Sequence, residues 1–233
     1  MIQVIQVQSN PQVRSLGLLT LGNLLRMAGN YRAAETVLHS LKDNSAVVDS
    51  HGFDSHGLDS HGLFMSLGKL NQAQYTQQVN FLRRTSSRQQ QYVRLQEAIH
   101  LATKSLQYYR QAAQENIASL PVLQAQLLQF SLLLKIKADL GDTLDQSPDL
   151  QGQLMSLPAI KQQLLLAGLD QFPTSESVIQ SQLSLAKSLL VDPDVSDRPP
   201  KALHYATRAL PGSKTTRRYR ISSSGARTVR TPL

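Results

Sequence analysis

The 233-residue chain contains no cysteine and no tryptophan, and aromatic residues make up only 5% of it. Without cysteine, disulfides, thiolate zinc sites, iron–sulfur clusters and cysteine nucleophiles are all excluded. The shortage of aromatic residues argues against an aromatic-rich β-sandwich. No apolar run reaches the length of about 18 residues that a membrane span needs, and the N-terminus lacks the basic region and apolar run of a signal peptide. We therefore expect no membrane span and, by default, a cytoplasmic location.

Two residue types are abundant instead, because the chain has 39 leucines and 26 glutamines. Both are good helix formers, and their combination suits long amphipathic helices better than strands. An apolar share of 41% in a chain of this length is also enough to bury a sizeable core. We predict an all-α protein.

Positive charge is concentrated at one end of the chain. The net charge is +8, but residues 211–233 contain six Lys and Arg side chains and no acidic one, so residues 1–210 carry only +2. This distribution argues against a basic groove through the fold and against nucleic acid as the main partner. We expect 211–233 to be either a disordered basic tail or a truncated or frame-shifted continuation. The alternative function is a basic helical protein that binds nucleic acid or an anionic surface through this Arg-rich tail.

Apolar residues recur at three- and four-residue spacing along most of the chain, which is typical of amphipathic helices. The pattern, with Gly and Pro at its interruptions, predicts helices over residues 12–28, 31–42, 64–84, 88–116, 121–141, 150–157, 158–172, 175–191 and 201–210. We divide the chain accordingly into a first helix pair (1–48), a linker (49–63), a longer helical array (64–210) and the tail (211–233).

The linker consists of three pentapeptides, DSHGF, DSHGL and DSHGL, between Asp49 and Leu63. A period of five matches neither a helix nor a strand, and Gly at every fifth position weakens a helix, so we expect a flexible loop. Its Asp, Ser and His superficially resemble a hydrolase triad, but a triad needs a rigid scaffold. The alternative is weak, adventitious metal binding by its three His and three Asp. We expect no cofactor and no specific metal site.

No other pattern predicts catalysis. The remaining histidines, His39, His100 and His204, stand alone in helical segments, where we expect them to be half-buried packing residues. There is no Gly-rich phosphate loop, H-E-x-x-H motif or nucleophile elbow. Tyr92 and Tyr109 lie at helix-packing spacing, which favours the core over base stacking. We therefore expect no catalytic residue, no small-molecule substrate and no enzymatic activity.

Leucine and small residues recur in the first two predicted helices at fixed distances from the Leu21-Gly22 step. These residues are Leu18, Leu21, Gly22 and Leu25 in the first helix, and Gly29, Tyr31, Ala34 and Leu38 in the turn and second helix. Their order resembles the packing positions of one tetratricopeptide (TPR) unit, a repeat of two antiparallel helices. Two positions depart from the pattern: Leu41 stands where Ala is favoured, and Ala46 replaces a closing Pro.

Two further matches to a TPR unit are weaker. The second places 25 extra residues between its helices, and the third places about four. Small residues at these positions let crossing helices approach closely. The packing positions are Leu67, Gly68, Tyr109 and Ala112 in the second unit, and Leu185, Ala186, Ala202 and Ala209 in the third.

A wider resemblance covers about residues 10–210. The segments SLGLLTLGNLLRMAGNYRAAETVL, LFMSLGKL, SLQYYRQAA, LQAQLLQFSLLL and IQSQLSLAKSLL, in this order, resemble the TPR region of large proteins with a C-terminal CHAT domain, a caspase-like peptidase module common in cyanobacteria. CHAT catalysis depends on a His and Cys pair downstream of the repeats. Since this chain has no Cys, the resemblance implies no peptidase activity.

The resemblance implies a TPR-like α-solenoid, and we expect a non-enzymatic scaffold fragment, part or remnant of a larger TPR-CHAT protein. Its stacked first helices would line a concave surface for an unknown protein or peptide partner. We expect Gln124, Gln126 and Gln129 to offer exposed amides to that partner. The apolar residues of 1–10 and the small-residue face of 201–210 leave the array without polar caps, so we also expect self-association through its ends.

Overall fold

A computed structural model describes residues 11–49, 60–114, 119–141, 143, 147–167, 169–173, 175–192 and 203–207 of the chain. Over these residues the regular secondary structure is helical and includes no strand, which confirms the all-α prediction. The basic tail, Ala202 and Ala209 lie outside the described residues.

The structure contains the following helices, in chain order. Their bounds are α2 (Pro11–Met27), α3 (Tyr31–Asp49), α4 (Ser60–Arg84), α5 (Arg88–Ala112), α6 (Leu120–Leu140), α7 (Pro148–Leu154), α8 (Leu157–Ala167), the 3-10 turn η2 (Leu169–Gln171) and α9 (Glu176–Val191). Residues 203–207 are also helical. Each helix predicted from apolar spacing therefore has a counterpart among the described residues.

Several helix ends differ from the prediction. α3 continues to Asp49 instead of ending at residue 42, and α5 ends at Ala112 instead of residue 116. α4 begins at Ser60, inside the third pentapeptide, so the predicted linker 49–63 is too long at both ends. The prediction was wrong there because Leu63 is only 2% exposed and packs in the core, which outweighs the helix-weakening effect of glycine. The other linker residues lie outside the described ranges.

The observed ends have local causes. Gly29, between α2 and α3, has φ of 78°, a left-handed conformation that glycine adopts without steric cost. The Asn30 N–H then donates to the carbonyl oxygen of Leu25 at 2.9 Å and closes α2. α6 and α9 begin after Ser119 and Ser175, whose side-chain oxygens accept from the backbone N–H three residues later.

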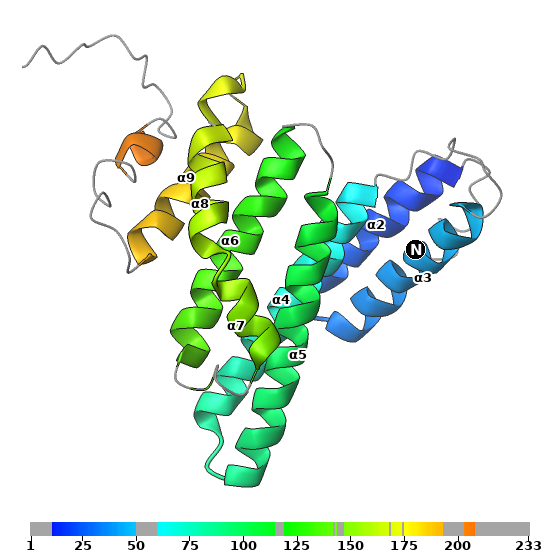
Figure 1. Ribbon diagram of the computed structural model, residues 1–233. Coiled ribbons are helices and arrows are strands. Elements are labelled where there is room, and N and C mark those ends of the chain that lie inside the picture. Colours follow the sequence, from blue (N-terminus) through cyan, green and yellow to red (C-terminus); the bar gives the residue numbers. More distant parts are fainter. Residues whose placement is uncertain are drawn as a thin grey trace, which may run out of the picture.

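The helices pack mainly against their neighbours in the chain (Figure 1). α2 and α3 form one pair, α4 and α5 form a long hairpin, and α6 packs against α5, α8 and α9. α2 also contacts α4, and α4 contacts α6. α2, α4, α6 and α9 thus form a contiguous row in which each helix touches the next.

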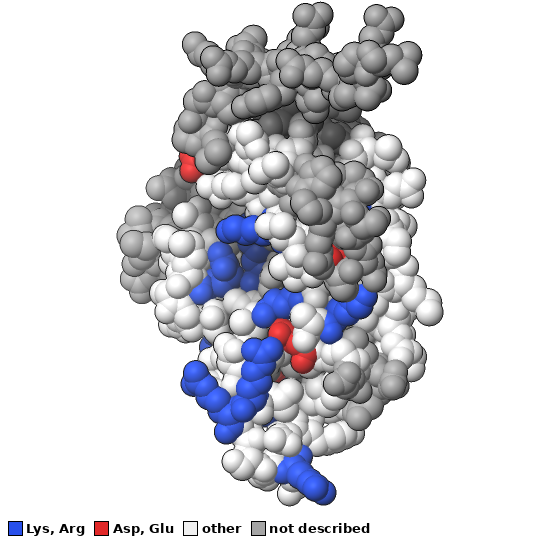
Figure 2. Space-filling view, turned by 90° about the vertical axis from the view of Figure 1, so that its left-hand side faces the viewer, with Lys and Arg blue, Asp and Glu red and all other residues white. Residues whose placement is uncertain are grey.

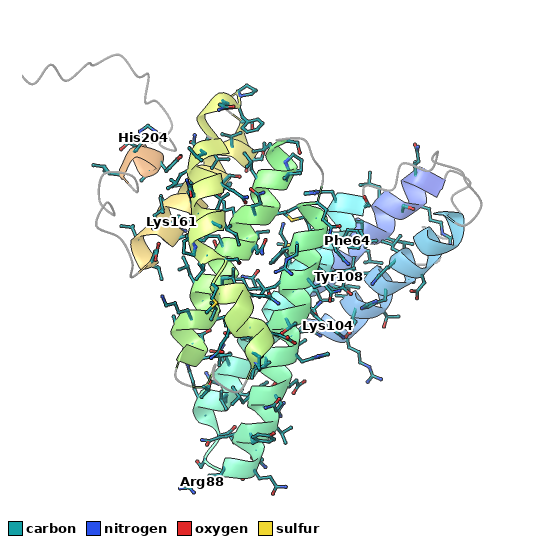
Figure 3. All side chains as sticks on the ribbon, viewed as in Figure 1. Phe64, Arg88, Lys104, Tyr108, Lys161 and His204 are labelled. Atoms are coloured by element: carbon teal, nitrogen blue, oxygen red, sulfur yellow. The ribbon has the colours of Figure 1, made fainter. Side chains whose placement is uncertain are left out.

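Apolar burial falls into two clusters that meet at α4 and α5. The smaller cluster joins α2 and α3 to the start of α4, and the larger one joins α4 and α5 to the helices that follow. The ring of Phe64 packs against both clusters and stacks on Tyr108 with ring centroids 6.3 Å apart, between α4 and α5 (Figure 3). Lys42 of α3 places its ammonium 5.3 Å from the centre of the Tyr108 ring, so α3 is tied to the same point.

Candidate functional site: a groove between helices α4, α6 and α9

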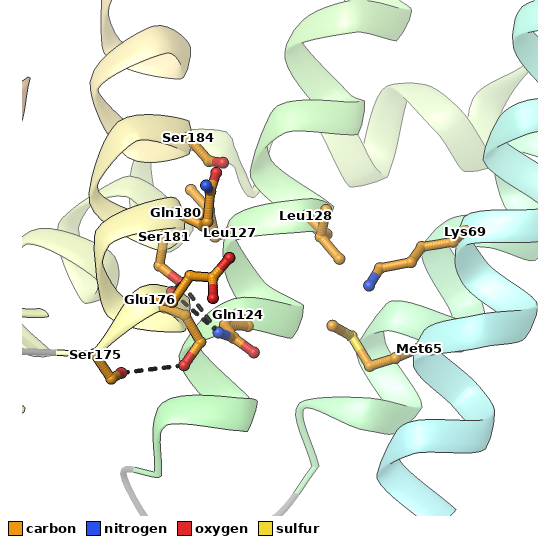
Figure 4. A pocket seen from close by; sticks show the side chains of 11 residues that line it. Met65, Lys69, Gln124, Leu127, Leu128, Ser175, Glu176, Gln180, Ser181 and Ser184 are labelled. Atoms are coloured by element: carbon orange, nitrogen blue, oxygen red, sulfur yellow. Dashed lines mark hydrogen bonds between the residues drawn. The ribbon is translucent and has the colours of Figure 1, made fainter. Parts of the chain in front are cut away.

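The described surface contains a groove of about 640 Å³ between α4, α6 and α9 (Figure 4). It lies along the row of helices defined above, and each of these three helices contributes a wall. Its lining residues are Met65 and Lys69 from α4, Gln124, Leu127 and Leu128 from α6, and Ser175, Glu176, Ser177, Gln180, Ser181 and Ser184 at the start of α9.

The three walls differ in chemistry. Met65 and Leu127 are almost fully buried, 8% and 3% exposed, so the α4 and α6 side of the groove is apolar. The α9 wall carries hydroxyl and amide groups instead. Gln124 reaches across from α6, where its Nε2 donates to the hydroxyl of Ser181 at 3.1 Å and to the carbonyl oxygen of Ser177 at 3.5 Å. The side-chain oxygen of Gln124 makes no hydrogen bond among the described residues, which leaves it able to accept one from a ligand.

Two charged groups face the groove from different walls. Figure 4 shows Lys69 pointing into it from α4 and Glu176 projecting beside Gln124. Neither side chain forms an ion pair or hydrogen bond with another described residue. Burial, and second the nearby guanidinium of Arg26, lower the pKa of Lys69. The Nε atom of Arg26 is itself buried without a hydrogen-bond partner in the described part of the chain. This end of the groove therefore has a surplus of positive charge that a carboxylate would neutralise.

Other charged clusters are internally paired and hold helices together. Asp139, with its side chain 8% exposed, lies 2.7 Å from the Arg83 guanidinium and 3.1 Å from the Lys135 ammonium. It also accepts a hydrogen bond from the Tyr75 hydroxyl at 3.1 Å, and burial together with this carboxylate raises the pKa of Tyr75. On the face that Figure 2 shows, Lys and Arg side chains gather around a few acidic ones. The paired groups stabilise the fold, whereas Lys69 and Glu176 have no such partner among the described residues.

Of the described residues predicted as TPR packing positions, all but one lie at helix contacts; Gly29 is exposed in the turn between α2 and α3, where a Cβ would meet no atom within 4 Å. A side chain at Gly22 would collide with Leu38, since a Cβ there would be 2.6 Å from its Cδ2 atom. Leu21, Leu25 and Tyr31 are half-buried against the smaller apolar cluster. The buried positions are Leu18, Gly22, Ala34, Leu38, Leu67, Gly68, Tyr109, Ala112, Leu185 and Ala186. Their packing is observed, while their assignment to TPR units stays a prediction.

Several predicted environments are wrong. Gln129 is buried at 6% exposure, and Gln124 and Gln126 are half-buried, because α6 is covered from several sides by its neighbours. Tyr92 is 61% exposed instead of lying in the core, because it lies near the end of the α4–α5 hairpin, which extends past the other helices. His100 and His204 are exposed, and of the three isolated histidines only His39 is half-buried as predicted.

Sequence reasoning missed the charged groove residues. The signal for Lys69 was present, since it is the only Lys, Arg, Asp or Glu between residues 60 and 82 and follows directly on Leu67-Gly68. It also missed His61, whose Nδ1 lies 2.8 Å from the carbonyl oxygen of Ala112 at the end of α5. A histidine of the low-complexity repeat therefore has a structural contact 51 residues away.

Comparison with known proteins leaves the family open. No protein-family model, curated protein or solved structure matches the chain. Among the described residues, no group of three or more His, Asp or Glu is placed to hold a metal ion. In the same part of the chain, no helix is both long and apolar enough to cross a bilayer.

Proposed function

We propose that this chain is a non-enzymatic helical scaffold of TPR type that binds a peptide segment of a partner protein in the groove between α4, α6 and α9. The observation that carries the proposal is the groove itself, with its apolar floor, its polar α9 wall and Lys69, which pairs with no described residue. The three helices that line it are consecutive members of the contiguous row of helices, and in a repeat array such a row would form the concave binding face.

The dimensions favour an extended peptide. The α9 wall runs from Ser175 to Ser184, about 13 Å at the helical rise per residue. An extended chain covers this distance with about four residues. Gln124 and Gln180 offer amide groups to the peptide backbone, and Met65, on the α4 wall across the groove from them (Figure 4), offers an apolar contact to a peptide side chain.

The charges of Lys69 and Glu176 set the direction in which the peptide lies in the groove. An acidic group at the Lys69 end would neutralise the ammonium that burial and Arg26 disfavour. A basic or N–H group at the other end would meet the carboxylate of Glu176. The preferred ligand is therefore a short segment with an apolar residue and an acidic group, from an unidentified partner.

A display library of random seven-residue peptides, selected on the full 233-residue chain, tests the proposal. The affinity of a selected synthetic peptide is then measured by fluorescence anisotropy for two variants. Ser184→Tyr fills the groove from its exposed rim, and Lys187→Tyr places the same ring on an exposed position of α9 outside the groove. We expect at least about a tenfold loss for Ser184→Tyr and little change for Lys187→Tyr, because only the first ring occupies the peptide position.

Charge reversal at Lys69 is a second arm of the test. Lys69→Glu should shift the selected peptides from acidic to basic residues. Peptides whose affinity is the same for wild type, Ser184→Tyr and Lys69→Glu would show that the groove is not the binding site.

A further inference from the structure

Helix α2 exposes an apolar stripe on the side that faces away from α3. Val13, Leu16, Leu24 and Met27 are 51%, 65%, 53% and 73% exposed, and Thr20 lies between them, also exposed. Among residues 12–27 of the helix, Gln12 is the one other exposed residue. An ordinary surface helix is polar on its exposed side, so α2 presents two apolar faces of which the described residues cover only one.

The order of residues along the stripe is symmetric about Thr20. Val13 and Met27 each lie seven residues from it, and Leu16 and Leu24 each lie four residues from it. If two copies of α2 pack antiparallel across a two-fold axis at Thr20, Val13 meets Met27 of the second copy and Leu16 meets its Leu24. Spacings of three, four, four and three average 3.5 residues, which keeps the stripe on one side along both helices.

The charges of α2 permit this pairing. Its two charged residues, Arg14 and Arg26, are half-buried and lie off the stripe, so two copies bring no like charges together. The stripe itself carries no charge that would select a different protein as its partner. A second copy, in contrast, provides a matching apolar residue for each apolar residue of the stripe. A two-fold dimer makes both halves of such a contact identical, which is the commonest symmetry of homo-oligomers.

We propose that the chain forms a symmetric dimer in which the Val13, Leu16, Thr20, Leu24 and Met27 stripe of α2 packs antiparallel against the same stripe of a second copy. Four apolar side chains bury less than the roughly 800 Å² per partner of a stable complex, so the expected dissociation constant is on the order of micromolar. The dimer does not depend on the peptide groove, which lies on other helices.

Cysteine cross-linking tests the geometry, because the natural chain contains no cysteine. Thr20→Cys should form an intermolecular disulfide under mild oxidation, since the two-fold axis brings the two substituted side chains together. Val13→Cys alone should not, because the antiparallel order places its two copies on opposite sides of the axis, about 21 Å apart along the helices. A mixture of Val13→Cys and Met27→Cys chains should cross-link. Self-cross-linking of Val13→Cys would overturn the antiparallel arrangement.

Sedimentation of the full chain over a wide concentration range tests the dimer itself. Leu16→Glu with Leu24→Glu should weaken association at least about tenfold, whereas Leu166→Glu, at a position 73% exposed on α8, should not. Circular dichroism checks that all variants stay helical. Met155→Cys, at a position 84% exposed outside the stripe, measures random cross-linking. A wild-type chain that sediments as a monomer at every concentration, or Met155→Cys cross-linking as readily as Thr20→Cys, would overturn the proposal.

Discussion

The ring of Tyr109 occupies the space that any side chain at Gly68 would need. A Cβ atom at position 68 would lie 2.5 Å from Cε1 and 2.6 Å from Cδ1 of this ring. Two hydrogen bonds hold the contact, because the Ser105 hydroxyl donates to the carbonyl oxygen of Gly68 at 2.8 Å and the Tyr109 hydroxyl donates to Gln72 at 2.5 Å. The close approach of α4 and α5 therefore depends on glycine at this position.

Gly68→Ala should lower the free energy of unfolding by about 1 to 3 kcal/mol, because the buried ring has no room to move away from the new methyl group. Gly152→Ala is the matched control. It lies in α7 with no atom within 4 Å of the added Cβ, so alanine should raise stability by about 0.5 to 1 kcal/mol through its helix propensity. Urea unfolding of both variants measures the difference, and equal effects would contradict the close contact.

We expect a similar loss of stability when a larger side chain is placed at Ala34, which is fully buried where α3 packs against α2. Ala34→Leu should destabilise the chain by about 1 to 3 kcal/mol through overpacking. Arg32→Leu, two residues earlier on the exposed side of α3, should stay within about 0.5 kcal/mol of wild type. A neutral Ala34→Leu in urea melts would show that α2 and α3 do not cross at this residue.

The sequence was most informative where a small residue coincides with an apolar repeat. Gly22, Ala34 and Gly68 could be predicted as helix contacts because Leu recurs around them at helical spacing and only short side chains permit a close approach. Exposure was harder to predict. Gln129 is buried instead of exposed because α6 lies at the centre of the fold, and Tyr92 is exposed instead of buried because the α4–α5 hairpin is long. Both causes are properties of the tertiary structure, which helical spacing does not reveal. The groove depends on how three distant helices converge, which no local pattern encodes.

His61 shows how low-complexity sequence misleads. Its Nδ1 donates to the carbonyl oxygen of Ala112, the last residue of α5, at 2.8 Å. His61→Ala should destabilise the chain by about 0.5 to 2 kcal/mol, because the buried end of α5 loses the donor for this carbonyl. His61 lies on α4, and the control His100→Ala removes an exposed imidazole from α5, the helix that carries the accepting carbonyl; it should change stability by less than about 0.5 kcal/mol. Similar losses in both variants, measured by thermal unfolding, would argue against a specific role for His61.

Lys69 makes stability depend on pH. Burial, with Arg26 as the second cause, lowers its pKa in the folded chain below the ordinary 10.5. Between the lowered pKa and 10.5 the unfolded chain binds more protons than the folded one, so the free energy of unfolding rises with pH in this window. Lys69→Met should raise stability at pH 7 by less than about 1 kcal/mol, since the ammonium keeps some solvent contact, and should abolish the rise. Lys69→Arg should also abolish the rise but give no gain, because a guanidinium stays charged in both states. Urea unfolding from about pH 7 to about pH 10 measures the three slopes, and a wild-type slope equal to that of both variants would show that the folded chain does not disfavour the Lys69 ammonium.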